Sequence, residues 1–429
     1  MHDPVMLGLG PFSWLELALM VALAAVAFAF WRLTRHQECG FVGEAGPDIT
    51  GGLRAMAGST HGHLIEGNAV TLIQNEAFFD EIEQAIDAAE KTVHFETFLW
   101  HADEAGERVT RMLERAARRG VTVRVLIDAS GSGKLPVKND KRLEEAGARV
   151  CRFHRWRLAT LGRLNIRDHR KILVVDGRLA FVGGHCVSNN WLKDEPDFPR
   201  FRDITARIRG PLVAKVQSCF FENWTERSGE VFVDETTFPE LEPEGEVTGH
   251  VAYVRCDQTP AAVQVLHHLA VGYARKRIWI QNPYFMPDRR GADMLIHAAK
   301  RGVEVRLMVP DLTATDSPVV SRAGRRHFTE LLNAGVKIYL YQKTLLHQKV
   351  LTVDGLWAAV GSSNFDDRSF EINDEITIGY ADERIARELE ETFERDLEEC
   401  KVVDLDWWKG RPLKEKVLTR VLSVFGEQF

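Results

Sequence analysis

The chain has 429 residues, of which 45% are apolar, and a formal net charge of -7 at pH 7. This length is sufficient for two or three folding units with a sizeable core. The acidic balance excludes the overall basic footprint of a nucleic-acid-binding protein, so any contact with a polyanion must be local. The six cysteines are scattered and form no CxxC pair, which indicates free thiols rather than a disulfide framework or a zinc site.

The N-terminal segment 12–31 is almost entirely apolar and is long enough, as a helix, to cross roughly 30 Å of hydrocarbon. We therefore predict a single membrane anchor within residues 1–39. Arg32 and Arg35 follow it, so the positive-inside rule places the rest of the chain in the cytoplasm. A cleaved signal peptide and a buried core helix are the alternatives, although the preceding MHDP has no basic residue. The glycine-rich residues 40–65 are predicted to be a linker.

Strand and helix patterns then alternate along the chain. Apolar, β-branched runs that predict strands are separated by segments with helical periodicity. This alternation predicts an α/β fold. The first expected elements are a strand at 70–73, a helix at 77–89, a strand at 92–99, a helix at 107–119 and a strand at 121–127.

A histidine and a lysine two positions apart occur twice, each time before an Asp-Gly turn and a glycine corner. The first copy reads HRKILVVDGRLAFVGG from His169, and the second reads HQKVLTVDGLWAAVG from His347. Side chains alternate along a strand, so the histidine and lysine of each copy point the same way, roughly 7 Å apart. An imidazole beside a fixed ammonium suits chemistry at phosphorus. One copy alone would favour a histidine and lysine on a solvated edge strand, and the second copy overturns that interpretation.

Other landmarks repeat as well. AARRGVTVRVLID at Ala116 resembles AAKRGVEVRLMVP at Ala298, and the two motif histidines lie 178 positions apart. The chain is therefore predicted to be a tandem duplication of one unit. The expected boundaries are a first half at 66–237, an acidic connector at 238–250, a second half at 251–405 and an amphipathic C-terminal helix at 406–429.

The paired HxKxxxxDxxxxxxG(G/S) motifs resemble the phospholipase D superfamily. ETFLW at Glu96, NPYFMPD at Asn282 and DDRSF at Asp366 are similar to its bacterial cardiolipin synthase branch. The resemblance covers residues from about 66 to 405. It implies two tandem phospholipase D-like α/β sandwich halves related by pseudo-twofold symmetry, with both HxK motifs facing one phosphorus.

The resemblance also implies a covalent phosphohistidine, in which one imidazole attacks and the other exchanges protons with the alcohols. By this resemblance His169 is the expected nucleophile and His347 the expected acid/base, although the pseudo-symmetry leaves the reverse assignment open. Each imidazole needs a carboxylate that fixes its tautomer. We expect Glu375 to serve His347 and Asp203 to serve His169.

The lysines of the motifs, Lys171 and Lys349, are expected to hold the nonbridging phosphoryl oxygens. Asp176 and Asp354 belong to the motif, but their Asp-Gly turns favour a structural role. Copy one carries Cys186 at the position where the family has asparagine. No metal or cofactor is implied, because the lysines supply the positive charge. The expected substrate contacts are Asn364, Ser362 and Gly184, with Glu96 and Asn282 projecting from corresponding strand ends toward one cleft.

Three further segments are basic or amphipathic, and each has an interpretation as a surface of the protein. Copy one has extra basic and aromatic residues within 150–169, which suit either an anionic membrane surface or a solvated loop. The C-terminal helix is consistent with an interfacial helix or with docking onto the body, and its apolar stripe consists of Leu413, Val417, Val421 and Val424. A second basic cluster is interpreted as a helix face rather than a ligand site, and it consists of Arg322, Arg325 and Arg326.

The resemblance implies phosphatidyl transfer between two phospholipids, which yields cardiolipin and a small alcohol such as glycerol. The predicted anchor, the basic insertion and the amphipathic C-terminal helix all favour lipid substrates. Phosphatidylglycerol is the expected donor and acceptor, with phosphatidylethanolamine as a further candidate, and the membrane is the expected partner. A phospholipase D that hydrolyses phospholipids to phosphatidic acid is the alternative. A nucleic-acid phosphodiesterase is disfavoured by the net negative charge and the predicted anchor. Nothing in the sequence indicates the oligomeric state.

Overall fold

The computed structural model describes most of the chain beyond its N-terminal segment. Residues 1–42 form a unit distinct from residues 43–429, and in the predicted anchor only positions 16, 18–23 and 26 are described, all of them helical. No helix within the described part of the chain is long and apolar enough to span a bilayer. The predicted anchor therefore lies largely outside the described residues, as does most of the basic insertion. Beyond residue 47 the described ranges are 48–133, 135–153, 166–196, 198–231, 235–254 and 261–423.

The first half alternates strands and helices as its hydrophobic pattern predicts. Its strands are β1 (Ile65–Gln74), β2 (Thr92–Thr97), β3 (Thr122–Asp128), β4 (Arg149–Phe153), β5 (Ile172–Val175), β6 (Leu179–Gly183) and β7 (Ile204–Arg209). Its helices are α3 (Ala77–Asp87), α4 (Glu104–Arg118), α5 (Val137–Glu145), α6 (Asn189–Leu192) and α7 (Leu212–Ser228).

The second half repeats this pattern and extends it at the C-terminus. Its strands are β8 (Val247–Val254), β9 (Arg277–Gln281), β10 (Phe285–Met286), β11 (Glu304–Pro310), β12 (Lys337–Tyr341), β13 (Val350–Val353), β14 (Trp357–Gly361), β15 (Phe365–Asp366), β16 (Glu375–Ala381) and β17 (Cys400–Val403). Its helices are α8 (Ala262–Tyr273), α9 (Arg289–Lys300), α10 (Pro318–Gly324), α11 (Phe328–Asn333), α12 (Asp367–Glu371), α13 (Glu383–Asp396), α14 (Leu405–Lys409) and α15 (Leu413–Ser423), with short 3₁₀ turns η2 (Arg325–His327) and η3 (Leu397–Glu399).

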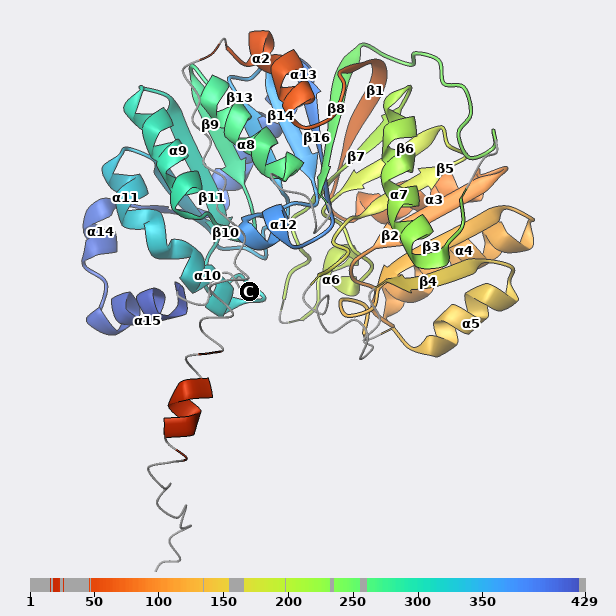
Figure 1. Cartoon of the computed structure of the whole chain (residues 1–429), viewed down its shortest axis with the longest axis horizontal. Helices are drawn as coiled ribbons and strands as arrows, with labels where there is room; N and C mark the ends of the chain where they lie inside the picture. The colour runs from red at the N-terminus through yellow and green to blue at the C-terminus, as the bar shows by residue number, and fades with distance from the viewer. Residues whose placement is uncertain are drawn as a thin grey trace, which may run out of the picture. The chain divides into compact units, whose positions relative to one another are not determined.

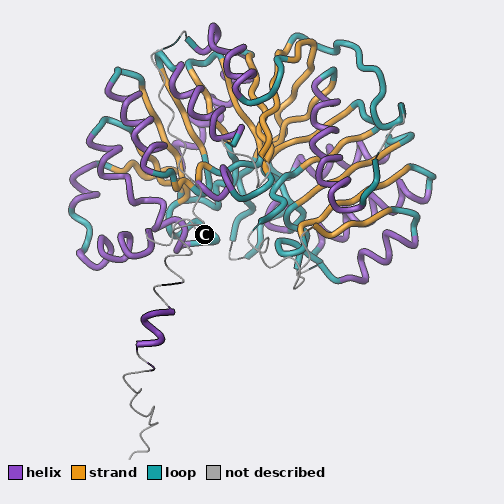
Figure 2. The backbone as a smooth tube through the Cα atoms, in the orientation of Figure 1, coloured by secondary structure: helices purple, strands orange, loops and turns teal. Residues whose placement is uncertain are grey.

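Fifteen of the described strands, from both halves, join in one sheet with helices on its two faces, whereas β10 and β15 pair in a small separate sheet (Figures 1 and 2). The first half has the order β4-β3-β2-β5-β6-β7-β1, and the second half has the equivalent order β12-β11-β9-β13-β14-β16-β8, with β17 at its outer edge. The halves meet where β1 pairs antiparallel with β8. This repeated order confirms the predicted tandem α/β halves.

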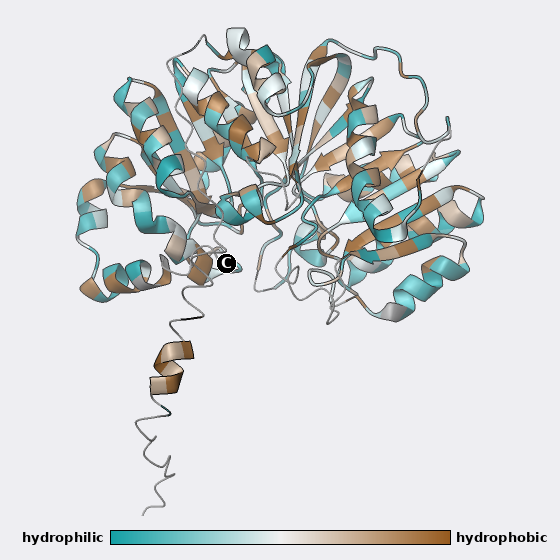
Figure 3. Ribbon diagram, in the orientation of Figure 1, coloured by the Kyte–Doolittle hydropathy of each residue, from teal (hydrophilic) through white to brown (hydrophobic). Residues whose placement is uncertain are grey.

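A continuous hydrophobic core joins the two halves. One cluster of buried side chains includes Val216 of α7 and Leu389 of α13, together with strand residues from both halves. Figure 3 shows hydrophobic residues concentrated along the strands and hydrophilic residues on the outer helices. Because apolar burial is the main stabilising term, the halves form one folded body and not two independent domains.

Two boundaries differ from the sequence expectation. Part of the predicted linker forms helix α2 (Ile49–Ser59), which packs against α8 because Ile49 and Met56 bury apolar side chains there. The linker prediction is wrong for this helix, whose small residues and short length hid its periodicity. Strand β13 begins at Val350, so His347 and Lys349 lie in an extended segment just before the strand.

The motif aspartates lie at hairpin turns, at the end of the strand away from the histidines. Asp176 and Asp354 adopt φ of 52° and 58°, and each precedes a glycine with positive φ. This is the backbone of a two-residue hairpin turn. Asp354 accepts the backbone N–H groups of residues 275–277 at 2.7 to 2.9 Å, and Asp176 accepts those of residues 90–92 at 2.7 to 3.0 Å. Each carboxylate therefore holds the backbone at the start of the neighbouring strand, which is β2 for Asp176 and β9 for Asp354.

We predict that Asp354→Ala lowers the free energy of unfolding by about 1–3 kcal/mol, because three backbone donors lose a charged acceptor. Urea unfolding followed by tryptophan fluorescence measures this change. Asp80→Ala is the matched control, because the Asp80 side chain is 67% exposed and its surface ion pair contributes little. Unchanged stability combined with lost activity would contradict the structural role.

Candidate active site

Each HxK segment lies beside the opposite half of the chain. The backbone N–H of His169 donates to the carbonyl of Asp374 at 3.0 Å, and that of His347 donates to the carbonyl of Arg202 at 2.8 Å. Parallel β-bridges adjoin these bonds, between Asp168 and Asp374 and between positions 202 and 346. Glu375 directly follows Asp374, and Asp203 directly follows Arg202. Each histidine is thus placed next to a carboxylate of the other half.

The carboxylates therefore pair with the histidines crosswise. His169 Nδ1 lies 2.8 Å from Glu375 Oε1, and His347 Nδ1 lies 2.7 Å from Asp203 Oδ2. The sequence expectation that Glu375 serves His347 and Asp203 serves His169 is wrong. The two motif histidines are equivalent in the repeat, but the sheet brings each one against the partner half, and spacing within one copy cannot reveal this.

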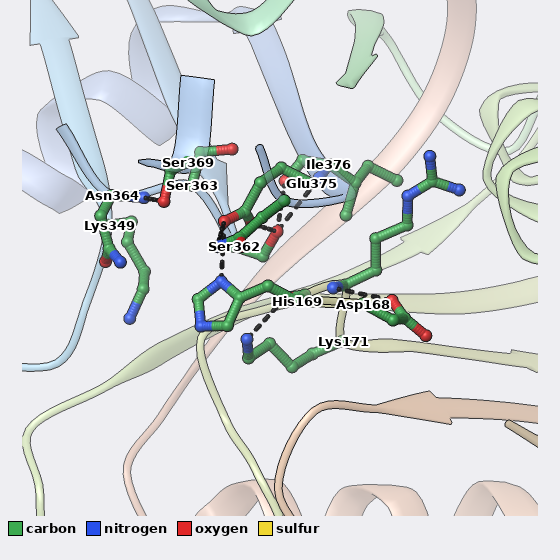
Figure 4. Close-up of polar contacts among 12 residues, drawn as sticks. Asp168, His169, Lys171, Lys349, Ser362, Ser363, Asn364, Ser369, Glu375 and Ile376 are labelled. Carbon is green, nitrogen blue, oxygen red and sulfur yellow. Dashed lines mark hydrogen bonds and ion pairs between the residues drawn. The ribbon is translucent and has the colours of Figure 1, made fainter. Parts of the chain in front are cut away.

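Both lysines lie close to both histidines, so the motifs form one site. Lys349 Nζ lies 3.0 Å from His347 Nδ1 and 3.1 Å from Nε2, and it donates to the His347 carbonyl at 2.6 Å. Lys171 Nζ donates to the His169 carbonyl at 2.6 Å. Figure 4 shows His169 with Nδ1 directed at Glu375 and with the ends of Lys171 and Lys349 beside its ring.

The electrostatic environment keeps both imidazoles neutral. Burial and then Lys349 lower the pKa of His347 to about 4, against the opposing effect of Asp203. Burial, followed by Lys171 and Lys349, lowers the pKa of His169 well below its ordinary value. Burial also lowers the pKa of Lys349 to about 8, with Lys171 contributing in the same direction. A bound phosphodiester anion would raise the pKa of each of these groups, because it stabilises their protonated forms.

The two carboxylates differ in their ionisation. Burial raises the pKa of Glu375 to about 7, and Lys171 and Ser362 offset only part of this shift. Burial acts in the same direction on Asp203, but His347 and the neighbouring His185 outweigh it and hold the pKa of Asp203 below its ordinary value. The pseudo-symmetric pairs are therefore chemically distinct.

Neighbours of the carboxylates explain how they are held. Ser362 Oγ donates to Glu375 and accepts the backbone N–H of Ile376 at 3.0 Å. Gly184, the equivalent of Ser362, has no space for a Cβ, which would overlap Asp203. The contacts of Ser362 and Gly184 in this structure are with carboxylates, not with an open cleft.

Aromatic side chains that the sequence analysis did not select position the imidazoles. Trp191 Nε1 donates to Asp203 Oδ2 at 2.7 Å, and its ring meets His347 edge-on at 5.0 Å between centroids. Phe98 meets His169 in the same way at 4.9 Å. Phe98 belongs to the ETFLW run and was therefore within reach of sequence reasoning, whereas nothing in the sequence marks Trp191.

Asn364 and Cys186 occupy equivalent positions with different chemistry. Asn364 Oδ1 is buried and has no hydrogen-bond partner among the described residues, so it is available to a ligand. Cys186 is 2% exposed, and burial raises its pKa against the effect of Lys171 and Lys349. The cysteine therefore lies near the lysines as a neutral thiol.

Glu96 and Asn282 do not project into one cleft, and that expectation is wrong. Glu96 is buried and accepts from Asn223 of α7 at 3.0 Å. The strand register makes Gln281 its equivalent, because Glu96 pairs with Ile172 and Gln281 with Val350. Asn282 instead accepts the backbone N–H of Phe365 at 3.2 Å. Adjacent strand positions face opposite sides, and the offset of one residue separates the two side chains.

We predict a pH-dependent effect of Glu375→Gln on stability. The folded-state pKa of Glu375 is raised from its unfolded value to about 7, so its contribution is full below about pH 4.5 and is lost as the pH rises through about 7. The free energy of unfolding of the variant, relative to the wild type, should therefore increase by up to about 3 kcal/mol over this range. Urea titrations at several pH values measure the difference.

Asp203→Asn is the control for this measurement. The folded-state pKa of Asp203 is lowered, so its contribution is present above its unfolded pKa and is lost only at lower pH. Its stability difference from the wild type should stay constant between pH 5 and 8. A constant difference for Glu375→Gln as well would show that Glu375 is ionised throughout.

Comparisons with known proteins agree with this site. Residues 82–217 and 270–397 match the family described as "Cardiolipin synthase, PLD-like domain". The chain is 34% identical over 371 residues to a cardiolipin synthase of Geobacillus kaustophilus, covering 85% of this chain and 73% of that protein. It is 35% identical over 353 residues to cardiolipin synthase A of Pseudomonas aeruginosa, covering 81% and 71% of the two chains.

Solved structures support the fold. The chain is similar to the crystal structure of a phosphatidylserine synthase from Haemophilus influenzae, with a TM-score of 0.65, 14% sequence identity and coverage of 83% of this chain and 92% of that chain. At this identity the likeness concerns the fold alone. With two matching segments, one in each half, and relatives that align over most of its length, the chain belongs to the cardiolipin synthase family with phospholipase D-like domains.

Proposed function

We propose that this protein transfers a phosphatidyl group from one phosphatidylglycerol to another, forming cardiolipin and releasing glycerol. The observation that carries the proposal is the pair of buried histidines, each fixed at Nδ1 by a carboxylate of the other half and flanked by two lysines. This arrangement presents two imidazoles to one phosphodiester. The cardiolipin synthase relatives support phospholipids as the substrates.

In the first step His169 Nε2 attacks the phosphorus of the donor lipid. A P–N bond forms, and the P–O bond to the headgroup glycerol breaks. The bound phosphodiester anion raises the pKa of His347, and its imidazolium gives a proton to the glycerol oxygen, so the alcohol leaves neutral and His347 becomes neutral imidazole. Lys171 and Lys349 stabilise the charge on the nonbridging oxygens.

In the second step a headgroup hydroxyl of the acceptor lipid attacks the same phosphorus. Its proton passes to His347, the P–N bond breaks, and the new phosphodiester joins the two lipids. An acceptor hydroxyl gives cardiolipin, whereas water in its place would give phosphatidic acid. Exclusion of water therefore decides between the two products.

The ionisation of the carboxylates supports this division of roles. Asp203 is held as a carboxylate, and an ionised partner stabilises the imidazolium that an acid/base residue forms, which favours His347 for that role. Glu375, with its raised pKa, contributes less negative charge to His169. This favours a neutral imidazole with a free lone pair, which a nucleophile requires.

We further propose that a single helix within residues 12–31 anchors the protein in the inner membrane, with the catalytic body in the cytoplasm. The apolar run and the arginines that follow it support this orientation.

The test is to reconstitute the full chain in lipid vesicles that contain phosphatidylglycerol labelled in its headgroup glycerol and in its acyl chains. We expect cardiolipin and free glycerol in equal amounts, resolved by thin-layer chromatography and mass spectrometry. His169→Ala and His347→Ala should each reduce turnover roughly 100-fold to 10,000-fold, because each removes an acid/base or nucleophilic group.

Phosphatidic acid as the sole lipid product would replace the synthase assignment with a hydrolase. Arg387→Gln is the control for losses during expression and reconstitution, and it should keep wild-type turnover because the Arg387 side chain is 69% exposed on α13. Substantial turnover in either histidine variant would refute the two-histidine scheme.

A further inference from the structure

A second cationic site lies at the C-terminal end of the chain, apart from the catalytic residues. Helices α10 and α15 pack against each other there and, with η2 and the segment after α14, enclose a cavity of about 480 Å³. None of the catalytic histidines or lysines lines it. Its basic lining residues are Arg322, Arg325, Lys401 and Arg411, and its acidic ones are Asp311 and Glu415.

Arg325 is the most buried of these cations. Arg325 is only 7% exposed and lies in η2, so the interpretation of this cluster as a helix face does not describe it. Within the described part of the chain, the guanidinium of Arg325 makes one long hydrogen bond, in which Nη2 donates to the carbonyl of Pro310 at 3.4 Å. A guanidinium carries five N–H donors, and a buried one without close acceptors is costly.

The other three cations of the cavity also lack a close ion pair with a carboxylate among the described residues. Arg322 Nε lies 3.5 Å from Glu415 Oε2. Arg411 donates Nε to the carbonyl of Trp408 at 2.9 Å and stacks on the Trp408 ring. Lys401 Nζ lies 3.8 Å from the centre of the Trp407 ring. Four cations face two carboxylates, so the cavity has a net positive charge on a chain whose overall charge is negative.

Burial and the neighbouring arginines disfavour the charged state of Arg325. Burial lowers the pKa of Arg325 to about 10, and Arg411 and Arg322 contribute in the same direction, against Asp311. Burial likewise lowers the pKa of Arg411 to about 10, opposed by Glu415. An anion in the cavity would relieve both the desolvation and the repulsion.

Exposed apolar side chains lie on the elements around this cavity. Leu413 and Val417 of α15 are 75% and 53% exposed, and Leu418 is 40% exposed. Trp407, which lines the cavity, is 39% exposed. A tryptophan and aliphatic side chains beside basic residues are typical of a helix that lies in the membrane interface.

We propose that this cavity binds the phosphate of an anionic phospholipid headgroup while α15 and Trp407 insert into the surrounding membrane interface. The guanidinium groups supply donors that match phosphate oxygens, which ammonium groups match less well. The apolar rim distinguishes a lipid from free phosphate, because inorganic phosphate gains nothing from Leu413 or Val417. The site is additional to the catalytic one and does not depend on which reaction the protein catalyses.

The test uses the full chain in nanodiscs made of phosphatidylcholine alone or with added phosphatidylglycerol. Hydrogen exchange of the backbone amides is measured at residues 318–327 and 405–423. We expect roughly tenfold or slower exchange at both segments with the anionic lipid, reduced by high salt. A third arm adds inorganic phosphate to phosphatidylcholine nanodiscs, and it should give little protection.

Variants then locate the effect. Arg325→Gln combined with Arg411→Gln should abolish the protection, because each basic group contributes on the order of tenfold or less to anionic-surface binding. The matched control is Arg118→Gln with Arg387→Gln, which removes the same charge from side chains that are 70% and 69% exposed. The control should keep the protection.

The wild-type arms decide the proposal even if the double variant folds poorly. Equal exchange in the neutral and anionic nanodiscs would overturn it. Equal protection by inorganic phosphate would overturn it as well, because the ligand would then be a free anion and not a membrane lipid.

Discussion

The crossed hydrogen bonds between each catalytic histidine and the carboxylate of the other half are the constraint on which the site depends. His169 is oriented by Glu375, and His347 by Asp203. Because each histidine–carboxylate pair takes one residue from each half, the proposed chemistry requires both halves. The pairing of β1 with β8 and the core shared by α7 and α13 hold the halves in the register that these bonds require.

Duplication provides two similar environments, and small substitutions make them different. Ser362 donates to Glu375, whereas the equivalent Gly184 makes room for Asp203, which receives the indole N–H of Trp191. Burial raises the pKa of both carboxylates, but interactions with His347, His185 and Lys349 reverse its effect only at Asp203. The proposed two-step transfer needs one histidine that remains neutral and one that exchanges protons, and this asymmetry would supply the difference.

Local patterns in the sequence predicted the parts of the structure that local interactions determine. The hairpins after each HxK motif, the Asp-Gly turns and the repeated strand order follow from periodicity and turn chemistry. The crossed pairing did not, because the bridges at Asp168 and Leu346 join segments far apart in the chain. Trp191 and Arg325 acquire their roles through burial, which no spacing in the sequence records.

The crossed pairing can be tested directly by pre-steady-state kinetics with a phosphatidyl ester of p-nitrophenol. This leaving group departs without a proton, so the first step requires the nucleophile but not the acid. His347→Ala should then give a burst of one nitrophenol per enzyme followed by slow turnover, and His169→Ala should give no burst. Asp203→Asn should keep the burst, as His347→Ala does, because Asp203 orients His347. Loss of the burst in Asp203→Asn would contradict it.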